Sequence, residues 1–511
     1  MRACFKKGEA ISLRRILKSV TKKVHQSLDI DIKARGCTDV AEEVRHGDIF
    51  FAIPHSERRS DASDDCGDEI ADSVGLAIHR GAAAIVADRP VVGAADVPYF
   101  IVPDIIEAFG AFCHALYGNP AKSIKLIGVT GTSGKTSTSC LISSMLAESG
   151  HSVGLITSLG VFDGEEFHSI ATNVMTPIDI AHWIQRCVLN GCTHLVLEVS
   201  SQMIAEGTLS GIKLDAVCLT NIKRDNLDYH KTVVHYRRTQ FDIFKYAKKK
   251  AIVLCNIDDK VSEAILPFIE NPLLTVGMKG MAEIGAMVIE SSPYEQTFVV
   301  TAGTEAVPFC TKIIGKEHIY NSLLAIGLGI AFSLDLRQIA RGIERVETIP
   351  NRMERIECGQ EFPVFIDSAR TTDSLTRTLK TVRSVTQGNL ICVFGAGEHH
   401  EKERRCQMSQ AIQTYADSII VTSSAVKPLD SATATAIFDI SKGFTETGAI
   451  KTMPSRVDAM AWALSVAKPG DSVLMIGNND HEVTDIESEA VLFSDRYFAK
   501  EWFVEQQLIA S

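Results

Sequence analysis

The sequence predicts an α/β protein of three domains, with a central parallel sheet that carries a phosphate-binding loop. Three observations lead to this prediction. Short apolar runs, suited to buried strands, alternate with helical stretches along most of the 511 residues. One run, residues 125–129, leads straight into a turn rich in glycine, threonine and serine and then into a helical stretch. Turn-rich segments near residues 120 and 348 divide the chain into pieces of ordinary domain size.

Residues 1–120 are expected to form a small N-terminal α/β domain. Residues 48–53 and 82–87 have the apolar, β-branched character of buried strands. A helix is predicted between them over residues 72–80, and the polar, charged residues 56–69 are predicted to be a loop.

Residues 121–348 are expected to form the central domain, a mostly parallel sheet flanked by helices. Its predicted strands are residues 125–129, 194–197, 216–219 and 251–255. Polar residues follow these strands at once, and the carboxyl ends of parallel strands meet at one edge of a sheet. Glu198 is therefore well placed to hold Mg²⁺ beside the phosphate loop. For Thr220, Asn221 and Asn256, contact with a ligand and capping of the next helix are both open.

The loop after the first of these strands has the form Gly-x-x-Gly-x-x-Gly-Lys-Thr. Its glycines let backbone N–H groups close around phosphate oxygens, and the next helix adds the positive potential of its N-terminus. Lys135 can reach the outer phosphates, and the Thr136 hydroxyl can hold Mg²⁺. A tight turn with a chance lysine is disfavoured, because Gly-Lys-Thr stands where a strand meets a helix. The predicted nucleotide-binding residues of the loop are Gly131, Thr132, Ser133, Gly134, Lys135, Thr136 and Ser137.

Residues 349–511 are expected to form a C-terminal Rossmann-like α/β domain. Its predicted strands are residues 364–367, 390–394, 418–422 and 472–476. Asp367 and the turn Gly395-Ala-Gly397 fall at strand carboxyl ends, where open α/β sheets bind ligands. The adjacent His399 and His400 are expected to lie in a solvated loop, because neighbouring residues rarely converge on one metal ion.

Charge and cysteine content narrow the class of protein. A net charge of −11 argues against nucleic-acid binding. The 13 cysteines form no Cys-x-x-Cys pair and indicate reduced thiols in a cytoplasmic protein, and no apolar run is long enough for a membrane span. Residues 11–20 have the pattern of a basic amphipathic helix, which we expect to dock on its own domain rather than on a membrane. The lysine-rich residues 245–250 are expected to end a solvated helix.

Several strings along the chain together resemble the Mur ligase family. They are the loop Gly-Val-Thr-Gly-Thr-Ser-Gly-Lys-Thr, Thr176-Pro177, Glu198-Val-Ser-Ser201, Leu227-Asp-Tyr-His230, Asn321-Ser, Asn351-Arg-Met-Glu354 and Val393-Phe-Gly395. The resemblance covers residues 47–496, and within the family it is greatest to the UDP-N-acetylmuramoyl-tripeptide synthetases. It implies an N-terminal domain that binds the UDP substrate, a central domain that binds ATP and a C-terminal domain that binds an amino acid.

This resemblance implies ATP-dependent amide synthesis for peptidoglycan precursors. ATP would phosphorylate a carboxylate of UDP-MurNAc-L-Ala-D-Glu, and the amino group of a diaminopimelate-class or lysine-class amino acid would then attack the acyl phosphate. The implied partners are these small molecules with Mg²⁺, and the chain is expected to be a monomer.

The resemblance also implies roles for single residues. The implied catalytic residues are Lys135, Glu198 and His230, with Mg²⁺ held by Thr136 and Glu198. The further ATP contacts are Asn321, Arg352 and Asp367. The uridine-nucleotide substrate would be lined by Thr176, Pro177, Ser200 and Ser201. The incoming amino acid would lie near Arg405, Lys427, Gly477 and Glu482.

The sequence departs from the family pattern at positions that take part in catalysis in the family. Asn226 stands where the family has a histidine, and Gln240 stands where it has a carbamylated lysine. These two family residues serve a second Mg²⁺. The alternative function is therefore a catalytically degenerate paralogue that binds nucleotide and acts as a regulator or partner. A folylpolyglutamate synthetase is a third interpretation, and the strings at residues 198–201 and 227–230 count against it.

Overall fold

The structure is a computed structural model of the 511-residue chain. It describes residues 10–26, 31–54, 66–91, 97–170, 175–397, 402–424, 430–445, 450–477, 483–486, 489–492 and 494–510. The chain divides into two compact units, of which the first comprises Met1–Glu283 and Leu324–Ile339 and the second Ile284–Leu323 and Ala340–Ser511. Both units contain sheets flanked by helices, so the predicted α/β class is confirmed. The bounds of the three predicted domains stay a prediction.

A small sheet in the first unit has the strand order β2-β7-β6-β5-β4. Strands β4 to β7 run parallel, and β2 is antiparallel to β7. The elements of this part are β1 (Ile11–Ser12), α1 (Leu13–Val20), β2 (His25–Gln26), β3 (Lys33–Ala34), β4 (Cys37–Thr38), η1 (Ala41–Glu43), β5 (Ile49–Phe51), α3 (Cys66–His79), β6 (Ala84–Ala87), β7 (Tyr99–Ile101), α4 (Ile105–Leu116) and η3 (Pro120–Lys122).

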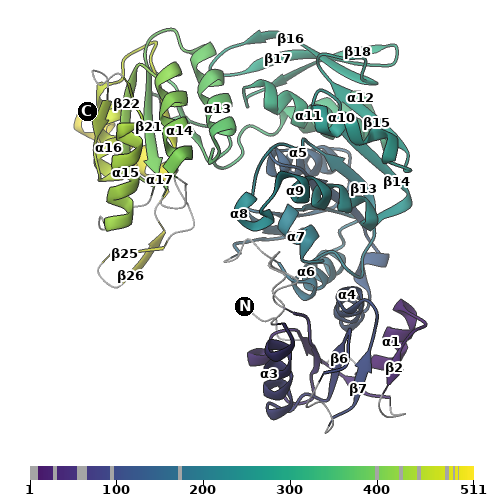
Figure 1. Ribbon diagram of the computed structural model, residues 1–511. Helices are drawn as coiled ribbons and strands as arrows, with labels where there is room; N and C mark the ends of the chain where they lie inside the picture. Colours follow the sequence, from purple (N-terminus) through teal and green to yellow (C-terminus); the bar gives the residue numbers. More distant parts are fainter. Residues whose placement is uncertain are drawn as a thin grey trace. The chain divides into compact units, whose positions relative to one another are not determined.

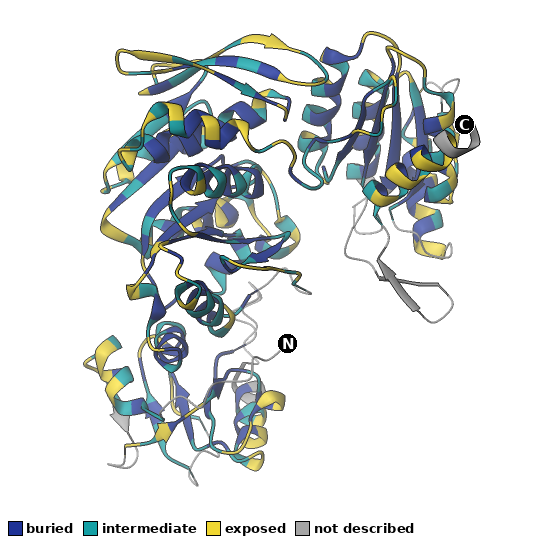
Figure 2. Cartoon of the chain, turned by 180° about the vertical axis from the view of Figure 1, so that it is seen from behind, coloured by how far each residue is buried: buried dark blue, intermediate teal, exposed yellow. Residues whose placement is uncertain are grey.

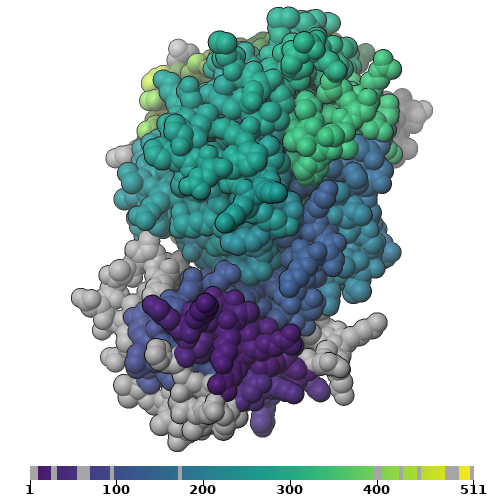
Figure 3. Space-filling view, turned by 90° about the vertical axis from the view of Figure 1, so that its right-hand side faces the viewer, coloured from purple at the N-terminus to yellow at the C-terminus, as the bar shows by residue number. Residues whose placement is uncertain are grey.

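Successive side chains of β5 point to opposite faces of this sheet, and both faces are buried. Ile49 and Phe51 share a core with helices α1 and α4, whereas Phe50 packs into the opposite core beside α3. Helix α1 fulfils the expected amphipathic pattern and docks on α4, and Figure 3 shows this purple helix lying over blue residues of the same unit. The predicted loop over residues 56–69 is wrong at its end, because α3 begins at Cys66; residues 55–65 lie outside the described residues.

The central sheet of the first unit has the order β11-β10-β9-β12-β8-β13-β14-β15. Strands β9, β12, β8, β13, β14 and β15 are parallel, and β10 and β11 add an antiparallel edge. Strand β8 lies between β12 and β13, which follow one another in sequence, so the order of the strands reverses beside β8. The carboxyl end of β8 is therefore at a switch point, where open α/β sheets bind ligands.

The predicted central strands are all present. The strands are β8 (Lys125–Thr130), β9 (Val153–Thr157), β10 (Gly160–Phe162), β11 (Phe167–His168), β12 (His194–Glu198), β13 (Leu214–Leu219), β14 (Ala247–Asn256) and β15 (Leu273–Gly277). The helices are α5 (Lys135–Glu148), α6 (Pro177–Leu189), α7 (Ser201–Ala205), α8 (Leu227–His230), α9 (Val233–Phe241), η4 (Asp242–Tyr246), α10 (Lys260–Ile265) and η5 (Leu266–Phe268). Helix α5, labelled in Figure 1, packs on β8, β9 and β12.

One prediction about this sheet is wrong. The lysines at 245–250 were expected to end a helix, but β14 begins at Ala247 and carries three of them. The amino end of β14 stays exposed, and the Lys248 ammonium lies 2.7 Å from the Asp215 carboxylate on β13. Ala247 pairs with Leu214 and Ile252 pairs with Ala216, so the three lysines lie in the irregular part of the β13–β14 ladder.

The second unit contains a small antiparallel sheet, β16-β17-β18, and a second doubly wound sheet of order β19-β20-β24-β21-β22-β23. The strands are β16 (Ile284–Ser291), β17 (Gln296–Ala302), β18 (Glu305–Thr311), β19 (Glu354–Ile356), β20 (Val364–Asp367), β21 (Leu390–Ala396), β22 (Ser418–Ser423), β23 (Ile450–Thr452), β24 (Ser472–Ile476), β25 (Val483–Ile486) and β26 (Glu489–Leu492). The helices are α13 (Thr372–Val385), α14 (Lys402–Tyr415), α15 (Ser431–Lys442), α16 (Arg456–Val466) and α17 (Asp495–Ala510), and α11 (Lys316–Ala331) and α12 (Leu336–Glu344) connect the two units along the chain.

Burial follows the predicted pattern in the second unit. Strands β20, β21, β22 and β24 run parallel and are almost wholly buried, whereas exposed residues lie on the outer faces of the helices around them (Figure 2). The four strands predicted for this region are therefore confirmed. Among the residues that the structure describes, none of the helices is both long and apolar enough to span a bilayer.

Candidate active site

The predicted phosphate loop connects β8 to α5. Its backbone requires glycine at two places, because φ is 132° at Gly131 and 88° at Gly134. A Cβ on Gly131 would also lie 2.1 Å from Thr220 Oγ1, so the loop can approach β13 only without a side chain there. The first N–H groups of the 14-residue helix α5 have no partners within the helix. Loop and helix start together therefore form an anion site.

Thr220 and Asn221, at the end of β13, hold this loop in place. Thr220 Oγ1 donates to Ser133 O at 2.7 Å, and Asn221 Nδ2 donates to the same carbonyl at 3.0 Å. Asn221 Oδ1 accepts from Ser133 N at 3.2 Å, and the Asn221 carbonyl accepts from Thr132 N at 2.8 Å. The polar residues that follow β13 thus support the loop directly, a role different from the two that the sequence left open.

Lys135 bends back over the loop. Its Nζ donates to the carbonyl oxygens of Gly131 and Thr132, at 3.0 and 3.1 Å. An ammonium in this position adds positive charge where the first N–H groups of α5 already favour an anion. The arrangement can neutralise the outer phosphates of a nucleotide, as expected for this loop type.

Thr136 and Glu198 meet across the end of the sheet. Thr136 Oγ1 donates to Glu198 Oε2 at 2.9 Å, and the same carboxylate oxygen accepts from Ser158 N at 3.0 Å. Thr136 lies in the first turn of α5, while Glu198 ends β12, whose register places it beside Val129 of β8. The structure therefore brings the two predicted metal ligands together.

The chemistry of these two residues fits Mg²⁺. Both present oxygen atoms, and Mg²⁺ is usually held by one or two carboxylates together with water and substrate phosphates rather than by a cage of protein ligands. In agreement, the described part of the chain contains no cluster of three histidine, cysteine or acidic residues that could hold a metal by itself. Thr136 and Glu198 would hold the ion beside the anion site.

His230 and Ser201 lie in one buried cluster near α7 and α8. His230 Nε2 is 2.9 Å from Ser201 Oγ, and Asn226 Nδ2 donates to the same hydroxyl at 3.4 Å. Burial, followed by the nearby His235, lowers the pKa of His230 to about 4, so the imidazole is neutral at physiological pH. Its Nδ1 finds no hydrogen-bond partner among the described residues. A neutral imidazole of this kind can accept a proton or a hydrogen bond.

The other residues predicted for the uridine-nucleotide substrate sit at helix starts. Thr176 caps α6 in a capping box with Asp179, and Pro177 occupies the first turn of that helix. Ser200 caps α7 by accepting from Met203 N at 3.1 Å. Thr176 and Ser200 therefore stabilise the starts of two helices, and contact of these residues with substrate stays a prediction.

In the second unit, Arg352 and Asp367 come close through a tight turn. Asn351 and Met353 on either side of Arg352 have φ of 57° and 48°. Asp367 accepts from Met353 N and Ala369 N, both at 2.9 Å. Burial raises the pKa of Asp367 in spite of these bonds and of the Arg352 charge. The turn therefore fixes a guanidinium beside a buried carboxylate.

Asn321 belongs to the same unit and is buried on α11, one turn after His318. Burial, together with the Arg352 charge, lowers the pKa of His318 to about 4. The Arg352 charge therefore acts on both His318 and Asp367 within the second unit.

The residues predicted for the incoming amino acid are only partly described. Arg405 is buried, and its Nη1 lies 2.9 Å from Asp439 Oδ2, so helices α14 and α15 are joined by an ion pair. Gly477 has φ of 85°, and a Cβ there would lie 2.5 Å from Gly395 O, so it permits close contact between the ends of β24 and β21. Lys427 and Glu482 lie outside the described residues.

Two residues of α9 contact the loop in a way that the sequence did not predict, because Gln240 was identified there only as a departure from the family's second metal site. Tyr236 and Gln240 on α9 reach Thr132 and Thr130 on either side of Gly131. The signal available in the sequence is their spacing of four, which places both on one face of a helix. Nothing in the sequence shows which element that face covers.

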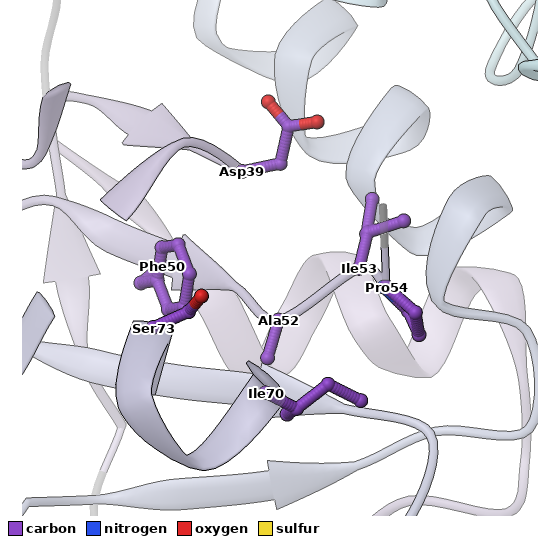
Figure 4. A pocket seen from close by; sticks show the side chains of 7 residues that line it. All are labelled: Asp39, Phe50, Ala52, Ile53, Pro54, Ile70 and Ser73. Atoms are coloured by element: carbon purple, nitrogen blue, oxygen red, sulfur yellow. The ribbon is translucent and has the colours of Figure 1, made fainter. Parts of the chain in front are cut away.

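The small N-terminal sheet has a pocket at the carboxyl end of β5. Figure 4 shows the Asp39 carboxylate on one side of it and apolar side chains on the other. It is lined by Asp39, Phe50, Ala52, Ile53, Pro54, Ile70 and Ser73. It lies at the end of a parallel strand, where open α/β sheets bind ligands.

Comparisons with known proteins agree on one family. Residues 129–329 match the Mur ligase middle domain, and residues 351–479 match the Mur ligase, glutamate ligase domain. The chain is 31% identical over 431 residues to a UDP-N-acetylmuramoyl-L-alanyl-D-glutamate--2,6-diaminopimelate ligase of Geobacillus thermodenitrificans, covering 83% of this chain and 87% of the relative. A relative of the same name in Syntrophomonas wolfei is 29% identical over 495 residues, covering 96% and 99%.

Solved structures show the same architecture. A UDP-N-acetylmuramoyl-L-alanyl-D-glutamate--2,6-diaminopimelate ligase superposes with a TM-score of 0.70 at 21% identity, covering 98% of this chain and 99% of that one. The MurF ligase from Thermotoga maritima in complex with ADP superposes with a TM-score of 0.58 at 18% identity, covering 92% and 96%. With near-complete coverage of its relatives and both family domains matched, the chain belongs to the Mur ligase family.

Proposed function

We propose that this chain is an ATP-dependent amide ligase that joins diaminopimelate to UDP-MurNAc-L-Ala-D-Glu in the synthesis of peptidoglycan precursors. The observation that carries the proposal is the contact of Thr136 with Glu198 at the N-terminus of α5, beside the Lys135 ammonium. Relatives of nearly the same length are named for this reaction, and the chain covers 87% of one and 99% of another.

Residues in and beside the phosphate loop take part in the proposed reaction. The N–H groups that begin α5 and the Lys135 ammonium bind the β- and γ-phosphates of ATP and oppose the charge that develops during phosphoryl transfer. Thr136 and Glu198 would hold Mg²⁺, which would supply positive charge against the negative charge of the phosphates. The phosphoryl group passes to the substrate carboxylate, and the amine of diaminopimelate displaces phosphate from the acyl phosphate.

His230 supports substrate handling in this proposal. Its imidazole is neutral because burial lowers its pKa to about 4, and Nε2 already bonds the Ser201 hydroxyl. It therefore orients Ser201 toward the UDP-linked substrate and contributes no positive charge. Asn226 shares that hydroxyl, so the residue that departs from the family pattern belongs to the same cluster.

The remaining substrates have candidate places in other parts of the chain. Thr176, Pro177, Ser200 and Ser201 are proposed to line the uridine-nucleotide substrate. Arg352 and Asp367 are proposed to contact the nucleotide. Arg405, Lys427, Gly477 and Glu482 are proposed to lie near diaminopimelate.

The nucleotide-binding regulator that the sequence left open is less well supported. Its basis is the exchange at Asn226 and Gln240, whereas the Lys135 ammonium over the phosphate loop and the contact of Thr136 with Glu198 support the ligase. The names of the relatives point in the same direction.

The test is a phosphate-release assay with ATP, Mg²⁺, UDP-MurNAc-L-Ala-D-Glu and either meso-diaminopimelate or L-lysine. We expect phosphate release that requires both the dipeptide and diaminopimelate, with a tripeptide product of the corresponding mass. Lys135→Ala should abolish it. Absence of phosphate release with every amino acid offered, in a chain that still binds ATP, would favour the regulator instead.

A further inference from the structure

Helix α9 makes a continuous hydrogen-bonded connection to the phosphate loop. Gln240 Oε1 accepts from Thr130 Oγ1 at 2.9 Å, and Gln240 Nε2 donates to Tyr236 Oη at 3.1 Å. Tyr236 Oη lies 2.7 Å from Thr132 Oγ1, which in turn accepts from Lys223 N at 2.8 Å. The two helix residues thus hold the loop on both sides of Gly131.

Burial makes this connection specific. Tyr236 and Gln240 are each 1% exposed, so water cannot replace a lost partner. Both amide atoms of Gln240 are bonded, which fixes the orientation of the side chain. Burial also raises the pKa of Tyr236 to about 12, so its hydroxyl keeps its proton and can bridge the glutamine and the threonine.

The same connection reaches the groups that bind phosphate. The carbonyl oxygens that hold the Lys135 ammonium belong to Gly131 and Thr132, and Thr132 is the residue that Tyr236 contacts. On the other side, the Thr130 hydroxyl lies 2.9 Å from both Gln240 Oε1 and Val199 O, next to Glu198. One helix face therefore sets the position of the lysine and lies one residue from the proposed metal ligand.

We propose that Tyr236 and Gln240 form a neutral brace that holds the phosphate loop in its ATP-binding conformation, which makes them positioning residues of this ligase. The inference rests on the proposed function, since it assigns ATP to this loop. A preorganised loop spends no binding free energy on ordering, so a loosened loop binds ATP more weakly even when every atom that touches the phosphates is retained.

The experiment measures ATP affinity by calorimetry and the KM values for ATP and diaminopimelate in three single variants of the full chain. Tyr236→Phe removes only the bridging hydroxyl, and Gln240→Met removes both amide contacts at similar volume. Tyr246→Phe is the matched control, because Tyr246 is also largely buried and its hydroxyl bonds Ser210 rather than the loop.

The expected result is a selective loss at ATP. Tyr236→Phe and Gln240→Met should each weaken ATP binding about tenfold. The KM for ATP should rise by a similar factor, while the KM for diaminopimelate stays unchanged. Tyr246→Phe should lower the thermal midpoint without changing ATP affinity. The double variant Tyr236→Phe/Gln240→Met should lose no more than either single variant, because both belong to one connection.

Three results would overturn the brace. The first is Tyr236→Phe with wild-type ATP affinity, and the second is a double variant whose loss is the product of the single losses. The third is a wild-type chain that binds no ATP, which would also remove the proposed function. Failure of the first or second kind in a chain that binds and turns over ATP leaves the proposed function intact.

Discussion

Thr136 Oγ1 donates a hydrogen bond to Glu198 Oε2 across 2.9 Å, although the two residues are 62 positions apart in the chain. The first begins a helix and the second ends the strand beside it, so the parallel pairing of β12 with β8 creates the contact. Two oxygen ligands are thereby assembled at the point where the phosphate loop directs its positive potential. The pairing of the two strands thus places a hydroxyl and a carboxylate together at the proposed active site.

The first prediction concerns the charge of Glu198. Glu198→Gln keeps an oxygen that can accept from Thr136 and from Ser158 N but removes the negative charge that attracts Mg²⁺. We expect kcat to fall at least about 100-fold, because the ion supplies several kcal/mol of charge stabilisation. The measurement is phosphate release over a Mg²⁺ titration, in which the half-saturating concentration should rise.

Glu206→Gln serves as the control for this change. Glu206 is a partly buried carboxylate at the end of α7 that accepts from Gln202 at 2.8 Å and lies away from the loop contacts. It should keep wild-type turnover and Mg²⁺ dependence. Equal effects of the two variants would remove Glu198 from the metal site.

The second prediction concerns the close approach at Gly131. Gly131→Ala places a Cβ 2.1 Å from Thr220 Oγ1 and 2.7 Å from the Asn221 carbonyl, at a φ of 132°. We expect a loss of about 2 kcal/mol or more in the free energy of unfolding, together with loss of ATP binding. Urea denaturation and calorimetry measure the two effects.

Gly150→Ala separates the two causes, because Gly150 also has a positive φ of 85° but nothing within 4 Å of its added Cβ. It should cost only about 1 kcal/mol, the penalty for the left-handed conformation, and leave ATP binding unchanged. If Gly131→Ala cost no more than this control, the steric argument at the loop would be wrong.

The strands and the phosphate loop could be predicted from the sequence, whereas the tertiary contacts around them could not. Residues 125–129 could be predicted as a strand because a short apolar run bounded by turn residues is typical of a strand in a sheet interior, and glycines fit the positive φ of the loop. Glu198 could be placed because parallel strands end at one edge. These inferences depend on local chemistry and on a general rule of topology.

The errors and omissions have a common physical cause. Lys248 lies in strand β14, between residues that pair with β13 and beside Asp215 of that strand, although a lysine run by itself has little tendency to form a strand. Gln240 contacts Thr130 across 110 positions of chain, and no local pattern encodes such a contact. The ion pair of Arg405 with Asp439 is likewise a tertiary event between two helices. Residues predicted only from the family pattern therefore acquire partners that the pattern does not contain.

The third prediction concerns pH and the buried His114 of α4. Burial lowers the pKa of His114 to about 4, against 6.5 in the unfolded chain, and neither ring nitrogen has a hydrogen-bond partner among the described residues. Between these values the unfolded chain binds more protons than the folded one. Stability is therefore complete above pH 6.5 and falls as the pH drops toward 4, by up to about 3 kcal/mol from this residue.

His114→Met should reduce this acid sensitivity, because methionine fills a similar volume without a titratable group. Urea midpoints measured from pH 7.5 to 4.5 should fall less steeply in the variant than in the wild type. His79→Met, at an exposed position, should keep the wild-type slope. Parallel curves for His114→Met and the wild type would show that His114 does not resist protonation in the folded chain.

The last prediction concerns the buried ion pair of Arg456 with Asp495 in the second unit. Arg456 is 1% exposed and donates through Nε to Asp495 Oδ1 at 2.8 Å, and through Nη1 to Ser423 O at 3.1 Å, at the end of β22. Asp495→Asn leaves the guanidinium buried without its counter-charge, so we expect a loss of about 3 kcal/mol or more in the free energy of unfolding. Asp458→Asn, an exposed aspartate in the first turn of the same helix, should change stability by less than about 0.5 kcal/mol. Urea denaturation of the full chain measures both changes in stability, with the fluorescence of Trp462 as a probe of the second unit.

The same ion pair is also expected to affect substrate affinity. Arg456 bonds the ends of two strands that precede the segments with Lys427 and Gly477, so the KM for diaminopimelate should rise in Asp495→Asn while ATP affinity is retained. A variant that is destabilised but keeps its wild-type KM would confine the pair to a structural role.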